Sequence, residues 1–265
     1  MIRIITAILL GLGIVAAIWW LPKDSFNILM LVILLIGSIE YGRMFFKDVL
    51  ERWVTVLSII ITAVVMIFFD NTRTLLPVTL ASLLFLLTML FMWRTSEMKG
   101  VAERIGLSTL GILYLGVSFS FWVWLRKMDY GNIAVLFAIA PACLCDTFAY
   151  AVGKACGRHK FAPKTSPNKT MEGFAGALVG SMLGVFVIWY FLVPHLEWYL
   201  PLGLAFIIWI TSPFGDLIES MLKRSCNVKD SGCIIPGHGG VLDRLDALIF
   251  TAPAAYLYMK YIFGW

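Results

Sequence analysis

The sequence predicts an all-α, polytopic integral membrane protein with about nine transmembrane helices. Of its 265 residues, 60% are hydrophobic and only 14% are charged. The mean hydropathy is +0.88, and apolar runs of the length that a bilayer requires recur along the whole chain. These observations exclude an ordinary soluble domain.

Windows of about 20 residues, the length that crosses a bilayer, define the expected spans. In chain order they lie near residues 4–21, 26–39, 53–69, 75–93, 105–125, 132–152, 174–193, 198–214 and 245–263. The second span is the shortest, and at about 1.5 Å per residue it falls short of a hydrocarbon core roughly 30 Å thick. It must borrow flanking residues or lie where the bilayer is thinner. The first span runs into Trp19 and Trp20 without a small-residue cleavage site, so we expect a retained helix rather than a signal peptide.

Lysine and arginine accumulate on the cytoplasmic side of membrane proteins and so predict the orientation. With nine spans, 16 of the 21 basic residues share one face. The other face carries Lys23, Arg73, Arg126, Lys127 and Lys260. This predicts a cytoplasmic N-terminus and a C-terminus outside. The net charge of +5 then reflects topology, and no nucleic-acid partner is expected.

One chemically dense loop on the cytoplasmic side is GRHKFAPKTSPNKTMEG, residues 157–173. Ser166 and Pro167 resemble an N-cap followed by proline at the first helical position, so we expect the seventh span's helix to begin near them. Lys164 and Lys169 would stand beside that helix N-terminus and form an anion site. The positive-inside rule, or contact with anionic lipid headgroups, would also explain a basic loop.

The other dense region is residues 212–246, where three aspartates matter most. Asp243 and Asp246 are three residues apart and project from one face of a helix at the mouth of the membrane. Asp216 closes the preceding span and could meet them. Three converging carboxylates repel one another unless a cation lies among them, and oxygen ligands favour Mg²⁺ or Ca²⁺. Ordinary helix capping would explain Asp243 but not all three.

Cations and glycines surround these acids, as the binding of a polyphosphate requires. They are Lys223, Arg224, Lys229, Arg244 and His238, with glycines at 232, 237, 239 and 240. The histidine could donate to a phosphate or only fix the turn. Asp146 lies inside the sixth span, where an ionisable group is costly, and is a further site candidate. Glu40, Glu97 and Glu103 stand beside arginines and are expected to be solvated ion pairs.

The segment from Ser220 to Asp246 contains S-M-L-K-R, K-D-S-G and I-P-G-H-G-G-V-L-D-R-L-D. It resembles the signature of the phosphatidate cytidylyltransferases, also called CDP-diacylglycerol synthases. The segment DTFAYAVGKACGRHKFAPKTSPNKTMEG, which begins at Asp146, is similar to a second block of that family. The resemblance covers most of residues 140–250. No G-x-x-x-x-G-K-[ST] motif is present, so a P-loop nucleotide site is excluded.

The resemblance implies that phosphatidic acid and CTP give CDP-diacylglycerol and pyrophosphate with Mg²⁺, and leaves room for a second cation. It also implies a bacterial plasma (inner) membrane, an active site on the cytoplasmic face and a possible homodimer. Residues 1–125 would then be a scaffold of transmembrane helices with possible dimer contacts, and residues 126–265 the catalytic region. A phosphate monoester is already mostly dianionic near neutral pH, so the enzyme's task is to align two anions with metal and cations.

The resemblance also implies roles for individual residues. Asp216, Asp243 and Asp246 would hold the metal, and Lys223 would act with them in catalysis. The substrate-binding residues would be Arg224, Lys229, Asp230, His238, Arg244, Ser220, Lys164, Ser166, Lys169, Thr170 and Asp146. Asn227 stands where the family pattern leads us to expect glycine, and asparagine tolerates a left-handed backbone better than most residues.

Two alternatives remain open from the residues alone. Another CTP-using membrane enzyme, such as a polyprenol-type lipid kinase or a transferase with a different phospholipid acceptor, would share the metal chemistry. A transporter for an anionic substrate would account for Asp146 and the basic loops, but it requires polar residues that continue to the far face.

Overall fold

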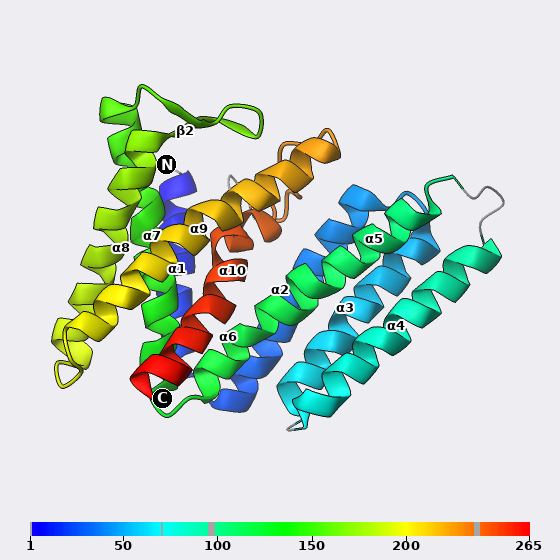
Figure 1. The fold of residues 1–265 in the computed structure, drawn as a ribbon, viewed down its shortest axis with the longest axis horizontal. Helices are drawn as coiled ribbons and strands as arrows, with labels where there is room; N and C mark the ends of the chain where they lie inside the picture. Colours follow the sequence, from blue (N-terminus) through cyan, green and yellow to red (C-terminus); the bar gives the residue numbers. More distant parts are fainter. Residues whose placement is uncertain (1, 70, 95–98, 236–238) are drawn as a thin grey trace.

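The computed structural model describes residues 2–69, 71–94, 99–235 and 239–265, with residues 2–10 as backbone only. It is a bundle of helices (Figure 1). The helices are α1 (Ile2–Trp20), α2 (Lys23–Phe45), α3 (Val49–Phe68), α4 (Thr72–Arg94), α5 (Val101–Gly111), η1 (Ile112–Val117), α6 (Ser118–Lys127), α7 (Gly131–Cys156), α8 (Met171–Leu192), α9 (Tyr199–Ser225), α10 (Leu242–Tyr258) and η2 (Met259–Phe263). The π-helical turns η1 and η2 continue the helices that precede them, so the described chain has one continuous helical stretch for each predicted span.

Seven of the described helical stretches are long and apolar enough to cross a membrane, by length and composition alone. They are α2, α3, α4, the stretch from α5 to α6, α7, α8 and α9. The last helix, α10, is shorter and carries Asp243, Arg244 and Asp246 in its first turns. The all-α polytopic architecture is therefore confirmed, whereas nine crossings remain a prediction.

The second helix is longer than its predicted span of residues 26–39. It runs for 23 residues, from Lys23 to Phe45, because Glu40 and Arg43 continue the helix rather than end it. The span therefore borrows flanking residues at both ends, as one of the two expected explanations requires.

The two chain termini lie at opposite ends of the bundle (Figure 1). At the end that holds the start of α1, a short hairpin joins α7 to α8, and the loop between α9 and α10 lies at the same end. The hairpin consists of β1 (Lys160–Ala162) and β2 (Ser166–Thr170), paired antiparallel with Lys160 opposite Thr170. We call this the hairpin end; it is the end that the charge pattern predicts to be cytoplasmic.

The predicted start of the seventh-span helix near Ser166 and Pro167 is wrong. Both residues lie in β2, and the helix begins at Met171. Thr170 is the residue that caps it, since its Oγ1 accepts a hydrogen bond from the Gly173 N–H at 3.1 Å. Residues 166–170 pair with β1 in an extended conformation, so they cannot form the first turn of a helix capped by Ser166.

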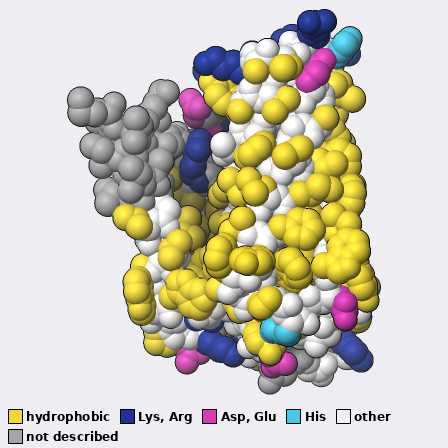
Figure 2. Space-filling model, turned by 90° about the vertical axis from the view of Figure 1, so that its left-hand side faces the viewer, with side chains coloured by type: hydrophobic (Ala, Val, Ile, Leu, Met, Phe, Trp, Pro, Cys, Tyr) yellow, Lys and Arg dark blue, Asp and Glu magenta, His cyan; other side chains and the backbone are white. Residues whose placement is uncertain are grey.

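Hydrophobic side chains cover the middle of the face shown in Figure 2, and most charged side chains gather towards its two ends. Arg126 and Lys127, two of the basic residues predicted on the outer side, bind helix ends. Arg126 donates to the Leu21 carbonyl at 3.0 Å, just beyond α1, and Lys127 donates to the Ile67 carbonyl in the last turn of α3. Cations are favourable at helix C-termini, which accounts for these two exceptions to the charge bias.

Small residues bring α7 and α8 into close contact. Gly173, Gly176, Gly180 and Gly184 of α8 all face α7. A Cβ at Gly184 would lie 2.7 Å from the Pro141 Cα, so no larger residue fits without a shift of the backbone. Spaced glycines of this kind let membrane helices pack closely, since van der Waals contact replaces the hydrophobic effect in lipid.

This packing predicts opposite effects for two glycine-to-alanine substitutions. Gly184→Ala should destabilise the protein by about 1–3 kcal/mol, the usual cost of overpacking. Gly106→Ala should raise stability slightly, because nothing lies within 4 Å of a Cβ at that helical position. Unfolding of each variant in the same detergent checks the signs, and a stable Gly184→Ala variant would contradict the close approach.

Candidate functional site

Lys169 of the hairpin reaches α9 and brings the two dense loops together. Its Nζ lies 2.7 Å from Asp216 Oδ2 and donates to the Pro213 carbonyl at 3.2 Å. An aromatic stack holds the hairpin in place: Phe161 of β1 stacks on Phe174 of α8 with ring centroids 4.9 Å apart. Lys169 therefore acts from a fixed strand rather than from a loose loop.

Three aspartates converge beneath this lysine, and we call Asp146, Asp216 and Asp246 the acidic cluster. They come from α7, α9 and α10, and each carboxylate is close enough to the others for electrostatic repulsion. Lys169 and Arg244 lie close enough to Asp146 to offset part of this charge. Such a cluster favours the binding of a cation, because like charges in a partly desolvated place oppose ionisation of all three.

Local packing explains why the acidic cluster forms. A Cβ at Gly215 would lie 2.6 Å from the Asp246 carbonyl oxygen, so the backbones of α9 and α10 touch at this point. Asp216 follows Gly215 directly and is thereby brought beside Asp246. On α7, Asp146 accepts a hydrogen bond from Ser212 Oγ at 3.5 Å, which links it to α9. Asp146 lies ten residues before the end of α7 at Cys156, and its side chain is exposed at the surface of the bundle.

A second polar group lies further along α9, and we call Glu219, Lys223 and Asp243 the Lys223 network. The Lys223 Nζ lies 2.5 Å from Glu219 Oε2 and 2.6 Å from Asp243 Oδ1. All three residues are buried, and Glu219 is completely so. One buried cation between two buried carboxylates holds α9 to the start of α10. Without the cation, the burial of either carboxylate would cost much free energy of folding.

Asp243 also accepts hydrogen bonds from the backbone of the α9–α10 loop. Its Oδ2 accepts from the Gly240 N–H at 2.7 Å and from the Ser231 N–H at 3.0 Å. With the Lys223 bond, both of its oxygens are engaged. Asp243 therefore binds the loop that leads into α10, whereas the first N–H groups of the helix itself bind Glu40.

Glu40 of α2 binds the same helix start. Its Oε1 accepts from the Val241 N–H at 3.0 Å, and its Oε2 accepts from the Leu242 N–H at 2.9 Å and from Ser231 Oγ at 3.1 Å. The residue is 1% exposed, so the expectation of a solvated ion pair is wrong. Because the N–H groups of residues 240–242 bind carboxylates, the expectation that this glycine-rich turn offers its N–H groups to phosphate is not met at those three positions.

The described residues contain no group of three or more His, Cys, Asp or Glu side chains arranged to hold a metal ion. The predicted triad of Asp216, Asp243 and Asp246 is divided between two settings. Asp243 belongs to the Lys223 network, whereas Asp216 and Asp246 belong to the acidic cluster. Mg²⁺ in nucleotide enzymes is commonly bound by one or two carboxylates together with substrate phosphates and water, so the pair of Asp216 and Asp246 fits that chemistry.

The other predicted binding residues lie around these two groups. Ser220 donates to Asp216 Oδ1 at 3.2 Å, and Arg224 donates to the Val228 carbonyl at 3.1 Å. Lys229, Asp230 and Arg244 are exposed near the α9–α10 loop. At the hairpin, Lys164 is exposed, Ser166 is half-buried and Thr170 is engaged as the cap of α8. His238 and Glu97 lie outside the described residues.

The sequence pattern did not single out Glu219, and it led to a wrong environment for Glu40. Glu219 stands four residues before Lys223, a spacing that places the two on one helical face and could have revealed the pair. Glu40 carries no comparable signal, because its partners lie about 200 residues away in the sequence.

The model of the cytidylyltransferase family matches residues 1–262, which include both polar groups and the hairpin. The chain belongs to the cytidylyltransferase family. This agrees with the resemblance found in residues 140–250, and it extends to the first half of the chain.

Several curated relatives carry the name phosphatidate cytidylyltransferase. The protein of Bacillus subtilis (strain 168) is 38% identical over 161 residues, which cover 58% of this chain and 58% of the relative. The protein of Staphylococcus aureus (strain COL) is 41% identical over 144 residues, or 54% of this chain and 55% of the relative. The chain thus spans less than two thirds of the length of these relatives.

Removal of the buried cation tests the Lys223 network. Lys223→Met leaves Asp243 and Glu219 without their partner and should destabilise the protein by about 3–5 kcal/mol, the usual cost of breaking a buried pair. Lys229→Met, at an exposed lysine of the same loop, should change stability by no more than about 0.5 kcal/mol. Unfolding in detergent measures both, and adding Glu219→Gln to Lys223→Met should restore part of the loss. Equal stability of the two single variants would show that the network does not hold the helices together.

Proposed function

We propose that this member of the cytidylyltransferase family is a CTP:phosphatidate cytidylyltransferase. It would convert phosphatidic acid and CTP to CDP-diacylglycerol and pyrophosphate, in phospholipid biosynthesis in a bacterial plasma membrane. The observation that carries the proposal is the meeting of the acidic cluster with Lys169 at one end of an apolar bundle. The relatives in Bacillus and Staphylococcus, which carry the name phosphatidate cytidylyltransferase, support the same activity.

The proposed reaction joins two anions. An oxygen of the lipid phosphate attacks the α-phosphate of CTP in line, the bond to the β-phosphate breaks, and pyrophosphate leaves. The attacking phosphate is mostly dianionic near neutral pH, so no residue needs to act as a strong base. The work of the protein is to hold the two substrates in line and to offset their charge.

Individual residues divide this work according to their positions. Lys169, fixed on β2 beside Asp216, would bind phosphate oxygens from one side of the site. Arg244, exposed in the first turn of α10, would bind them from the other. Lys229 stands on the loop beyond and could reach the nucleotide. Lys223 is engaged with Glu219 and Asp243, so its proposed role is to hold the loop rather than to bind phosphate.

Asp216 and Asp246 are the residues that would hold Mg²⁺, with Asp146 nearby as a further charge. The metal would supply electrostatic stabilisation of the charge that develops on the departing pyrophosphate. In the structure Lys169 lies against Asp216, so its ammonium group already supplies one positive charge at this carboxylate. Asp243 has both oxygens engaged and is assigned to the loop instead.

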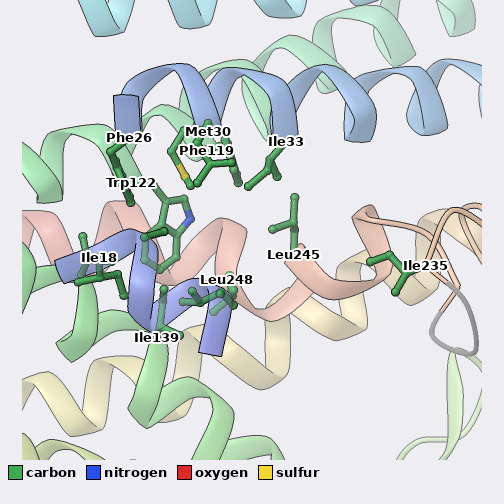
Figure 3. A pocket seen from close by; sticks show the side chains of 15 residues that line it. Ile18, Phe26, Met30, Ile33, Phe119, Trp122, Ile139, Ile235, Leu245 and Leu248 are labelled. Atoms are coloured by element: carbon green, nitrogen blue, oxygen red, sulfur yellow. The ribbon is translucent and has the colours of Figure 1, made fainter. Parts of the chain in front are cut away.

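An apolar cavity of about 560 Å³ supplies room for a lipid tail. It lies among α1, α2, α6, α7 and α10, and all of its lining residues are apolar in type. In Figure 3, Ile235 lies at one end of the cavity, Leu245 lies further in, and Phe26 and Trp122 lie towards the other end. Leu245 precedes Asp246 in α10, so a tail in the cavity would leave its headgroup near the acidic cluster.

The direct test is release of pyrophosphate by the purified protein given CTP, short-chain phosphatidic acid and Mg²⁺. We expect release to require all three components. Asp216→Asn and Asp246→Asn should each lower kcat at least about 100-fold. Substitution of residues that only orient a metal ligand already lowers activity by up to about 100-fold, and loss of the ligand itself should cost no less. Asp129→Asn is the matched control, because Asp129 is exposed in the loop between α6 and α7, at the other end of the bundle.

Activity of both variants at the control level would contradict the assignment of these two aspartates. Folded protein that releases no pyrophosphate would contradict the proposed activity itself. It would favour a different acceptor lipid first and transport of an anion second, and a panel of lipid acceptors with CTP would separate these.

A substitution in the cavity tests the place of the lipid tail. Ala17 of α1 lines the cavity next to Ile18, whereas Val15 is exposed and does not line it. Ala17→Phe should lower kcat/KM for long-chain phosphatidic acid about tenfold relative to short-chain substrate, a discrimination typical of apolar pockets. Val15→Phe should leave the ratio unchanged. The same chain-length profile in both variants would exclude this cavity as the tail site.

A further inference from the structure

We infer that Glu40 of α2 is a positioning residue for the α9–α10 loop, which carries part of the nucleotide site in the proposed reaction. The inference rests on the proposed function for its kinetic consequence. Its structural basis is independent of that function. Glu40 lies in the part of the chain that was expected to be only a scaffold.

The geometry is that of a helix cap supplied from another helix. The N-cap residue of α10 is Val241, whose side chain cannot accept a hydrogen bond. The first N–H groups of a helix need acceptors, and burying them without acceptors is costly. Glu40 supplies both of its carboxylate oxygens, which accept from the N–H groups of Val241 and Leu242. A negative charge is also favourable at a helix N-terminus.

The same carboxylate fixes the loop. Its Oε2 accepts from Ser231 Oγ at 3.1 Å, while the Ser231 N–H binds Asp243. Ser231 is thus held by two carboxylates from different helices. Lys229 and Asp230 immediately precede it, so the position of these exposed residues depends on both bonds.

Two glycines show how closely the loop is fitted to Glu40. A Cβ at Gly232 or at Gly240 would collide with the Glu40 carboxylate group. Neither glycine has a positive φ angle, the backbone conformation that favours glycine. Gly239, next to Gly240, does have one, with φ near +82°. Close approach to Glu40 at position 232, and to Ser231 Oγ and Glu40 at position 240, rather than backbone conformation, therefore accounts for these two glycines.

A purely stabilising cap and a positioning residue predict different kinetics. Loss of folded protein scales the apparent kcat and leaves every KM unchanged. Loss of loop position moves the groups that contact the nucleotide and so raises KM for CTP. KM for phosphatidic acid should change less than KM for CTP, because Ile235 is the one described residue of this loop that lines the apolar cavity and the other lining residues lie on helices.

Glu40→Gln is the decisive variant because it keeps the size of the side chain. In either orientation its amide NH₂ faces a backbone N–H of Val241 or Leu242, so one hydrogen bond is lost. We expect amide hydrogen exchange in residues 228–242 to become at least tenfold faster, KM for CTP to rise about tenfold, and kcat to fall by up to about 100-fold. Glu40→Asp should give intermediate values. Glu103→Gln, at an exposed glutamate of α5, is the matched control and should match the unmodified protein.

Unchanged exchange in this loop together with an unchanged KM for CTP would overturn the inference. A lower melting temperature with both KM values unchanged would also overturn it, since that result describes a stabilising cap alone. Should Glu40→Gln fail to fold, Ser231→Ala removes only the hydroxyl bond and is read in the same way. If the unmodified protein has no cytidylyltransferase activity, the proposed function fails, whereas the exchange experiment still decides whether Glu40 orders the loop.

Discussion

The buried pairing of Lys223 with Asp243 and Glu219 is the interaction on which the rest of the site depends. It places one cation between two carboxylates, away from water, and it joins α9 to the start of α10. Removing a partner from such a group is far more costly than removing an exposed ion pair. With Asp243 held by Lys223, the Gly240 and Ser231 N–H groups share one acceptor, which joins the two described parts of the loop.

The acidic cluster lies next to the Lys223 network on the same two helices, since Asp216 precedes Glu219 on α9 and Asp246 follows Asp243 on α10. The contact of α9 and α10 at Gly215 brings Asp216 beside Asp246, and Asp146 joins them from α7. Lys169 reaches the same place because the aromatic stack of Phe161 and Phe174 holds the hairpin against α8. Lys169 comes from the hairpin, whereas Arg244 and Asp246 share α10. In the proposed reaction, a site at helix ends would receive the nucleotide from water while the lipid tail stays in an apolar setting.

Much of the fold could be predicted from the sequence, because membrane helices follow from length and apolarity alone. The left-handed backbone at Asn227, with φ of 57°, was also predictable, since few residues besides glycine adopt it readily. The wrong start of α8 has a physical cause: Ser166 and Pro167 have the local pattern of a helix start, but pairing with β1 overrides it. Glu40 could not be found, because a side chain that caps a helix 200 residues away leaves no local pattern. The separation of Asp243 from Asp216 and Asp246 likewise depends on Lys223 and on the loop, not on spacing along α10.

The central claim is transfer of a cytidylyl group, and the fate of the individual phosphates of CTP tests it most directly. The purified protein would be given phosphatidic acid, Mg²⁺ and CTP labelled with ³²P at either the α or the γ position. Attack at the α-phosphate predicts that the α label enters the lipid and that the γ label is released in pyrophosphate. Transfer of the γ label to the lipid, with release of CDP, would identify a lipid kinase and contradict the account.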